Sequence, residues 1–180
     1  MFIGGEHTSD IWLERNTIAH NAWFGLAIDR RQHRYTLVDN SITRNGFIGI
    51  DRGLDGFDGY AFNVDHTNVT SAQVPPPRVL SAIYDPSTNL TTITGTYFRE
   101  RENFRSAEIT LYANSLNDGQ GETVLGTTST PSGMFAFNIP GDLTGKFITA
   151  TGRYTLDLEL GGVHFWNTEF SESIAVSPIQ

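Results

Sequence analysis

The sequence predicts an all-β protein in which a short stack of parallel β-coils is followed by an antiparallel β-sandwich of immunoglobulin type. Three observations lead to this fold class. A pattern of asparagine, isoleucine and glycine recurs near the start of the chain at an offset of 24 residues, a spacing typical of one coil of a solenoid. The remainder reads as about seven short strand-like segments between turn signals, as in a sandwich. Charged residues make up only 18% of the chain and aromatic residues 12%, which favours strands over helices.

The repeat aligns four pairs of like residues: Asn16 with Asn40, Ile18 with Ile42, Asn21 with Asn45 and Gly25 with Gly49. Apolar residues alternate within each copy, which predicts a strand with one buried face; they are Phe24, Leu26 and Ile28, then Ile48 and Ile50. We expect the asparagines to adopt left-handed backbone conformations at sharp corners and to hydrogen-bond to their equivalents one coil away. The letters FIG at 2–4 return at 47–49 and, in related form, as WFG at 23–25. This predicts a third, partial coil in that register.

A run of three prolines, Pro75–Pro77, marks the expected domain boundary, because proline supplies no backbone donor to a sheet. We assign residues 1–74 to the partial coils with an Asp/Gly-rich loop and a linker, and residues 75–180 to the sandwich. Sandwich strands are expected at 79–84, 90–97, 107–113, 123–128, 134–139, 146–160 (one long strand or two) and 164–176. Residues expected to face the sandwich core are Ile109, Leu111, Phe135, Phe137 and Ile139.

The chain resembles a family of large bacterial extracellular proteins in which a right-handed parallel β-helix precedes a small immunoglobulin-like sandwich. The resemblance rests on NSITRNGFIGID, ITLYANSLNDGQGETVLG, GKFITATGRY and the terminal NTEFSESI, and it covers about residues 11–177. The chain departs from the family at Arg52, where Leu is usual, and in a longer hairpin at 153–166. The resemblance implies a right-handed β-helix of two to three coils, and surface display, adhesion or matrix roles. In more distant β-helix proteins it implies cleavage of acidic polysaccharides, but no catalytic residue carries over.

Charge and composition exclude several classes of partner. The net charge is −8, so nucleic acid and anionic membrane surfaces should be repelled. The chain has no cysteine, which excludes disulfides and thiolate metal sites. No apolar stretch approaches the length of a membrane span.

Carboxylates suggest two candidate sites. Asp29 and Asp51, beside Arg30 and Arg52, follow strand ends of neighbouring coils, where β-helix lyases and hydrolases place catalytic groups; such residues are more often solvated turn caps, and we expect no enzymatic activity. Asp51, Asp55 and Asp58 lie within one Gly-rich loop and form a candidate calcium site, although the loop lacks the EF-hand spacing. The five histidines show no spacing suited to a metal, and no other cofactor is indicated.

Two or three coils are few for a stack that needs neighbours to bury its interior. We therefore expect a non-enzymatic extracellular structural module that self-associates head to tail into filaments or a surface layer. Its contact residues would be Phe2, Ile3, Leu13, Ile18, Trp23, Phe24 and Leu26. The alternatives are a longer chain with further coils upstream, a carbohydrate-binding adhesin piece contacting sugar through Trp23 and Trp166, and a non-catalytic C-terminal fragment of a β-helix polysaccharide lyase or hydrolase.

Overall fold

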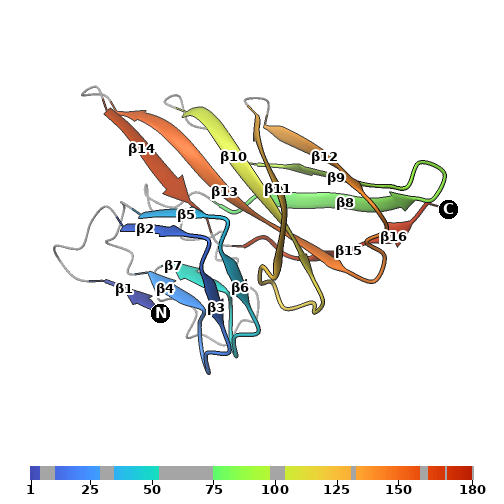
Figure 1. The fold of residues 1–180 in the computed structure, drawn as a ribbon. Helices are drawn as coiled ribbons and strands as arrows, with labels where there is room; N and C mark the ends of the chain where they lie inside the picture. The colour runs from blue at the N-terminus through green and yellow to red at the C-terminus, as the bar shows by residue number, and fades with distance from the viewer. Residues whose placement is uncertain are drawn as a thin grey trace.

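The computed structural model describes residues 1–4, 11–28, 35–52, 75–97, 104–130, 133–158, 162–168 and 170–179. All regular secondary structure in these ranges is β-strand, so the all-β prediction is confirmed. Figure 1 shows small parallel sheets, built from residues 2–52, beside a larger antiparallel sandwich, with the two chain ends far apart.

Three small parallel sheets form the N-terminal part. One contains β1 (Phe2–Ile3), β4 (Leu26–Ile28) and β7 (Ile50–Arg52), the second β2 (Ile11–Glu14) and β5 (Tyr35–Val38), and the third β3 (Thr17–Ala19) and β6 (Ser41–Thr43). The pairs Leu13 with Leu37, Ile18 with Ile42 and Leu26 with Ile50 lie side by side. The predicted pairing of the two copies at an offset of 24 residues is therefore confirmed.

The first strand has a different register from the one expected. Phe2 pairs with Ala27 and Ile3 with Ile28, whereas the recurrence of FIG predicted that 2–4 would align with 23–25. Ile3 and Ile28 are both buried, and this register places one above the other. The observed register therefore goes with burial of these two isoleucines and not with the repeated letters FIG.

The turns that follow β2, β3, β5 and β6 confirm one expectation about asparagine and correct another. Asn16 and Asn21 donate from both backbone and side-chain amides to Oδ1 of Asn40 and Asn45, so the predicted ladder is present. The left-handed residues, however, are the ones that precede the asparagines. They recur at the same offset of 24: Arg15 with Asp39 and His20 with Arg44, all with φ between 50° and 58°. These conformations cost about 1–2 kcal/mol each, and the adjacent ladder bonds offset that cost.

Two antiparallel sheets form the sandwich. The first has the order β12 (Met134–Pro140), β9 (Leu90–Thr96), β8 (Arg78–Asp85) and β16 (Ser177–Pro178). The second has the order β11 (Thr123–Thr130), β10 (Phe104–Asn114), β13 (Phe147–Leu158) and β14 (Gly162–Asn167), with β15 (Ile174–Ala175) also paired to β13. All pairs are antiparallel except β16 with β8.

The predicted sandwich strands agree with these elements. The segment 146–160 contains one long strand, β13, and the segment 164–176 is divided between β14 and β15. Ile109, Leu111 and Phe135 are buried in the core, and Phe137 and Ile139 pack against it. The alternation of apolar residues thus predicted these five positions correctly.

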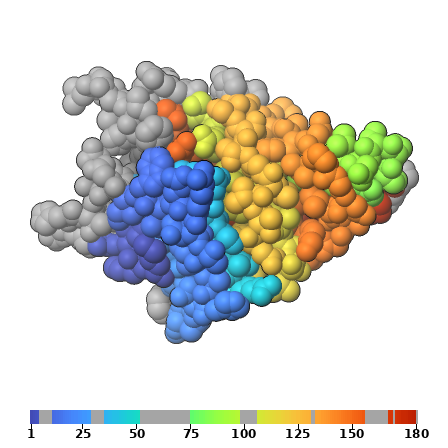
Figure 2. All heavy atoms as spheres, in the orientation of Figure 1, coloured from blue at the N-terminus to red at the C-terminus, as the bar shows by residue number. Residues whose placement is uncertain are grey.

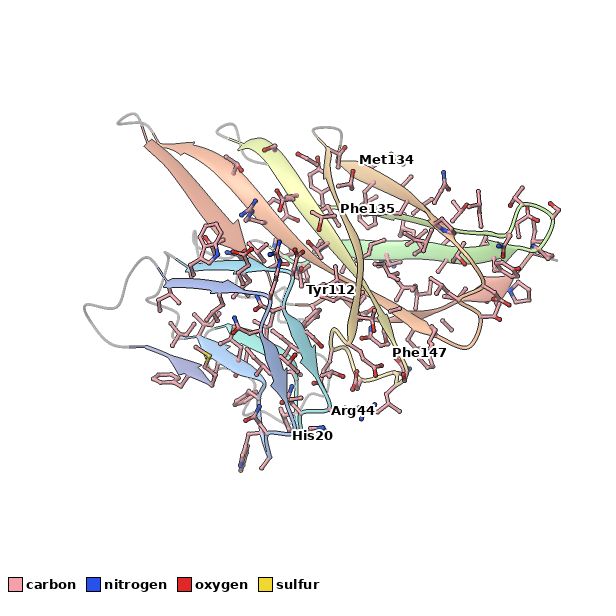
Figure 3. The ribbon with its side chains drawn as sticks, viewed as in Figure 1. His20, Arg44, Tyr112, Met134, Phe135 and Phe147 are labelled. Atoms are coloured by element: carbon pink, nitrogen blue, oxygen red, sulfur yellow. The ribbon has the colours of Figure 1, made fainter. Side chains whose placement is uncertain are left out.

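A second apolar cluster joins the sandwich to the small sheets. Its buried members are Ile3, Leu26, Ile28, Tyr35, Ile42 and Ile50 together with Tyr112 and Phe170. In Figure 2 residues 35–52, in cyan, lie between the blue first copy and the yellow strands of the sandwich. Tyr112 points from β10 toward the small sheets in Figure 3. The two predicted units therefore share a core, while the boundary itself stays a prediction, because residues 53–74 are outside the described ranges.

Candidate functional site: the two edges of the small parallel sheets

Along β6, the edge formed by the second copy is closed by the β10–β11 loop, residues 115–122. Gln120 occupies the place where the asparagine of a further copy of the repeat would stand. Its Oε1 accepts from the backbone N–H of Asn45 at 3.0 Å and from Asn45 Nδ2 at 2.9 Å, the same two bonds that Asn45 Oδ1 accepts from Asn21 at 3.2 and 2.8 Å. Its Nε2 donates to the carbonyls of Asn45 and Phe47. Gln120 is buried and continues the asparagine ladder by one step.

Backbone bonds beside Gln120 extend the third small sheet. Ile42 and Gly121 exchange two N–H···O bonds of 2.7 Å, as in an antiparallel bridge. Ser41 Oγ donates to the carbonyl of Glu122 at 2.7 Å. Donors and acceptors on the outer side of β6 are thus paired with the loop.

Asn167, at the end of β14, pairs with the outer side of β5. Its Oδ1 accepts from the N–H of Leu37 at 3.3 Å, and its Nδ2 donates to the carbonyl of Tyr35. The Tyr35 hydroxyl donates to the Asn167 carbonyl at 3.1 Å. A side-chain amide carries one donor side and one acceptor side. It therefore pairs with the C=O and N–H groups of an edge strand as a neighbouring peptide would.

Phe170 fills the centre of this contact. Its ring makes an edge-to-face contact with Tyr112 at a centroid distance of 5.1 Å. A Cβ at Gly121 would lie 2.5 Å from the ring and a Cβ at Gly49 2.8 Å from it, so both glycines permit the close approach. Burial raises the pKa of Tyr112 to about 12, so its hydroxyl stays neutral at physiological pH. The contact is apolar at its centre and hydrogen-bonded at its sides.

Two carboxyl groups of the loop have shifted pKa values of opposite sign. The pKa of Glu122 is lowered, chiefly because Ser115 donates hydrogen bonds to the carboxylate, with smaller effects of Arg44 and Lys146. Partial burial raises the pKa of Asp118. Only the Glu122 shift stabilises the folded loop at neutral pH.

Acidification is expected to remove the contribution of Glu122. A carboxyl with a lowered pKa stabilises the fold above its ordinary value, 4.5, and this contribution is lost as the pH falls through the folded-state value. Urea unfolding should therefore show wild type more stable than Glu122→Gln at pH 7, with the difference shrinking below about pH 4.5. Asp118 is present in both proteins, and its raised pKa is due first to burial, with the charge of Glu122 the last of its causes, so the comparison chiefly reports the loss of Glu122. An equal difference at pH 7 and pH 3 would contradict this assignment.

The opposite edge, formed by β1, β2 and β3, has no such closure within the described ranges. Asn40 and Asn45 donate from Nδ2 across the stack to the carbonyls of Leu13 and Ile18, 27 residues back. Asn16 Nδ2 instead donates to the carbonyl of Glu14 in its own copy of the repeat at 3.1 Å, and Asn21 Nδ2 to that of Ala19 at 3.5 Å. The ladder therefore stops at this open edge.

The predicted self-association residues divide into two groups. Ile3 and Leu26 are buried in the shared core, and Leu13 and Ile18 pack against it. Phe24 makes an edge-to-face contact with Phe47 at 5.6 Å. Phe2 and Trp23 are about 60% exposed, and Trp12, which was not among the predicted contacts, is exposed to a similar degree. The exposed aromatic residues flank the open edge.

The other predicted site residues are only partly described. Asp51 lies in β7 with its side chain fully buried, so the expectation of a solvated turn position is wrong for this residue. Asp29, Arg30, Asp55 and Asp58 lie outside the described residues, and so do the side chains of Arg52 and Trp166. The calcium site and sugar contact at Trp166 stay predictions. The described residues contain no cluster of three or more metal-ligating side chains.

The residues that close the edge were missed in the sequence. NDGQGE at 117–122 has the composition of an ordinary hairpin turn, yet Gln120 within it is buried. One feature of the sequence could have indicated this contact: Gln120 lies between two glycines. In the structure Gly121 allows the close approach of Phe170, and Gly119 has a φ of 64°. NTEFSESI is one of the segments that carry the family resemblance, and it contains Asn167 and Phe170, which contact the small parallel sheets.

No helix in the described ranges has the length and apolar character needed to cross a membrane. Comparison of the chain with protein-family models, curated proteins and solved structures gives no match.

Proposed function

We propose that the chain is a non-enzymatic extracellular structural module that self-associates through the open edge of its coil stack. In this proposal residues 2–52 form a short right-handed parallel β-helix, and an immunoglobulin-like sandwich closes its other edge. The observation that carries the proposal is the difference between the two edges. One edge is closed by Gln120. At the other edge, Nδ2 of Asn16 and of Asn21 donates to a carbonyl within the same repeat.

Strand order supports the architectural part of the proposal. The parallel pairs recur around the coil at one offset, as stacked turns of a β-helix require. In the sandwich, β8, β9 and β12 have the sheet positions of immunoglobulin strands A, B and E, and β10, β13 and β14 those of C, F and G.

An open sheet edge supports the functional part, because unpaired N–H and C=O groups on an edge pair readily with another strand. Phe2, Trp12 and Trp23 add exposed aromatic surface beside the edge, and an aromatic side chain buries about 150–250 Å² when covered. Pairing at this edge would cover both kinds of group at once. The net charge of −8 opposes non-specific contact between unassembled copies.

Lysines on the open edge are expected to weaken association. Trp12 and Thr17 are exposed, so Trp12→Lys/Thr17→Lys should leave the fold intact while placing charge where a partner strand would pair. Sedimentation velocity over a concentration series should show association of the wild type and at least about a tenfold weaker association of this variant, a change of about 1.4 kcal/mol.

Met134→Lys/Ser129→Lys is the matched control, since both residues are exposed and both variants gain the same charge. Met134 lies on the sandwich, far from the small sheets, in Figure 3. The control should associate as the wild type does. Equal weakening by both variants, or a wild type that stays monomeric at all concentrations, would contradict the proposal.

Carbohydrate binding is a second candidate, favoured by the exposure of Trp23. Exposed aromatic rings stack on sugar faces. Glycan-array binding that is lost in Trp23→Ala and retained in Met134→Ala would support it, and an array without binding would exclude it.

A further inference from the structure

Resting on the proposed function, we infer that the partner at the open edge is the open edge of a second copy, so that the assembly is a closed two-fold pair. Such an interface is isologous: the same residues contribute from both copies, and growth ends at two chains. A head-to-tail filament would instead need two different complementary surfaces on each chain.

The closed edge argues against head-to-tail stacking of coils. Another chain could continue the stack head to tail only if the edge formed by its second repeat, residues 35–52, were available. That edge is bonded within the chain by Gln120, Gly121 and Asn167, and Phe170 fills the apolar space beneath it. Freeing it would leave buried polar groups unpaired, at about 1–3 kcal/mol for each group.

The open edge can satisfy itself. Asn16 and Asn21 each have a side-chain Oδ1 that accepts no hydrogen bond within the described residues, while Nδ2 of each donates partly to its own coil. A carboxamide carries both donors and acceptors, so two such groups facing each other across a two-fold axis can bond in both directions. The backbone of an edge strand is self-complementary in the same way, because identical strands can pair antiparallel.

Charge also permits pairing of like edges. The chain as a whole carries −8, which opposes contact between most surfaces of two copies. At the open edge the acidic Glu14, the last residue of β2, lies next to the basic Arg15, 3.6 Å away. Their charges offset each other, so this pair adds no net charge that would oppose contact between two copies of the edge.

The average mass of the protein over a concentration series distinguishes a closed dimer from open-ended growth and from a monomer. Sedimentation equilibrium should show a monomer–dimer equilibrium that saturates at two chains. Open-ended growth beyond two chains would overturn the two-fold inference and leave the proposed self-association standing. A strict monomer at all concentrations would overturn both.

Single cysteines supply the second arm, because the chain has none of its own. Trp12→Cys, Glu14→Cys and Thr17→Cys each place one thiol on β2 or β3, and Ser87→Cys places one in the exposed β8–β9 turn as a control. Under mild oxidation the position nearest the two-fold axis should form a disulfide between identical copies, and Ser87→Cys should not. Associated protein without such a cross-link at any of the three edge positions would contradict a two-fold contact.

Discussion

Phe170→Ala is expected to lower the free energy of unfolding by about 3–5 kcal/mol, the usual cost of removing a buried aromatic ring. The ring is 7% exposed and touches residues from both parts of the molecule. Tyr112 would lose its edge-to-face partner, and Gly49 and Gly121 would face a cavity, because neither has a side chain to fill it. Urea denaturation at pH 7 measures the loss.

Phe170→Leu is the matched control. Leucine refills part of the space without the aromatic contact, so it should cost clearly less than alanine. Ala136 on β12 is exposed, and Ala136→Ser should leave stability within about 0.5 kcal/mol. A loss below about 1 kcal/mol in Phe170→Ala would mean that the ring does not join the small parallel sheets to the sandwich.

Gln120→Ala is expected to cost about 2–4 kcal/mol, since it leaves several buried polar groups of Asn45 and Phe47 without partners. Leu116→Ala, in the same loop but 57% exposed, should change stability by less than about 0.5 kcal/mol. Urea denaturation of both variants checks the difference.

A double-mutant cycle isolates the ladder bond itself. Asn45→Ala and Gln120→Ala remove opposite sides of one contact, so the double variant should be more stable than the sum of the single losses predicts, by about 1–3 kcal/mol. Additive losses would show that Gln120 stabilises the loop without holding Asn45.

The features that sequence predicted best depend on neighbours along the chain. Alternation identified Ile109, Leu111 and Phe135 as core, since a strand turns every second residue to the same face. The asparagine ladder followed from one repeat distance, because stacking in register brings Asn16 onto Asn40.

The features that sequence missed depend on contacts across long separations. Gln120 meets Asn45 from 75 positions away, and Asn167 meets Tyr35 from 132. No local pattern distinguishes a glutamine that docks into a ladder from one in an ordinary turn. The error about the turns had a different cause. Asparagine tolerates left-handed angles, but here Arg15 and His20 adopt them, and the asparagine that follows donates to the second copy of the repeat.

Amide hydrogen exchange at Ile42 and Asn45 tests the central claim most directly, namely that the sandwich loop closes the edge of the second repeat copy along β6. Both N–H groups are bonded to the loop, so both should exchange as slowly in the wild type as Ile93 in the sandwich core. In Gln120→Ala the Asn45 amide should exchange at least about tenfold faster, with Ile93 less affected. Exchange of Ile42 and Asn45 in the wild type as fast as at the exposed turn residue Thr88 would contradict the closure.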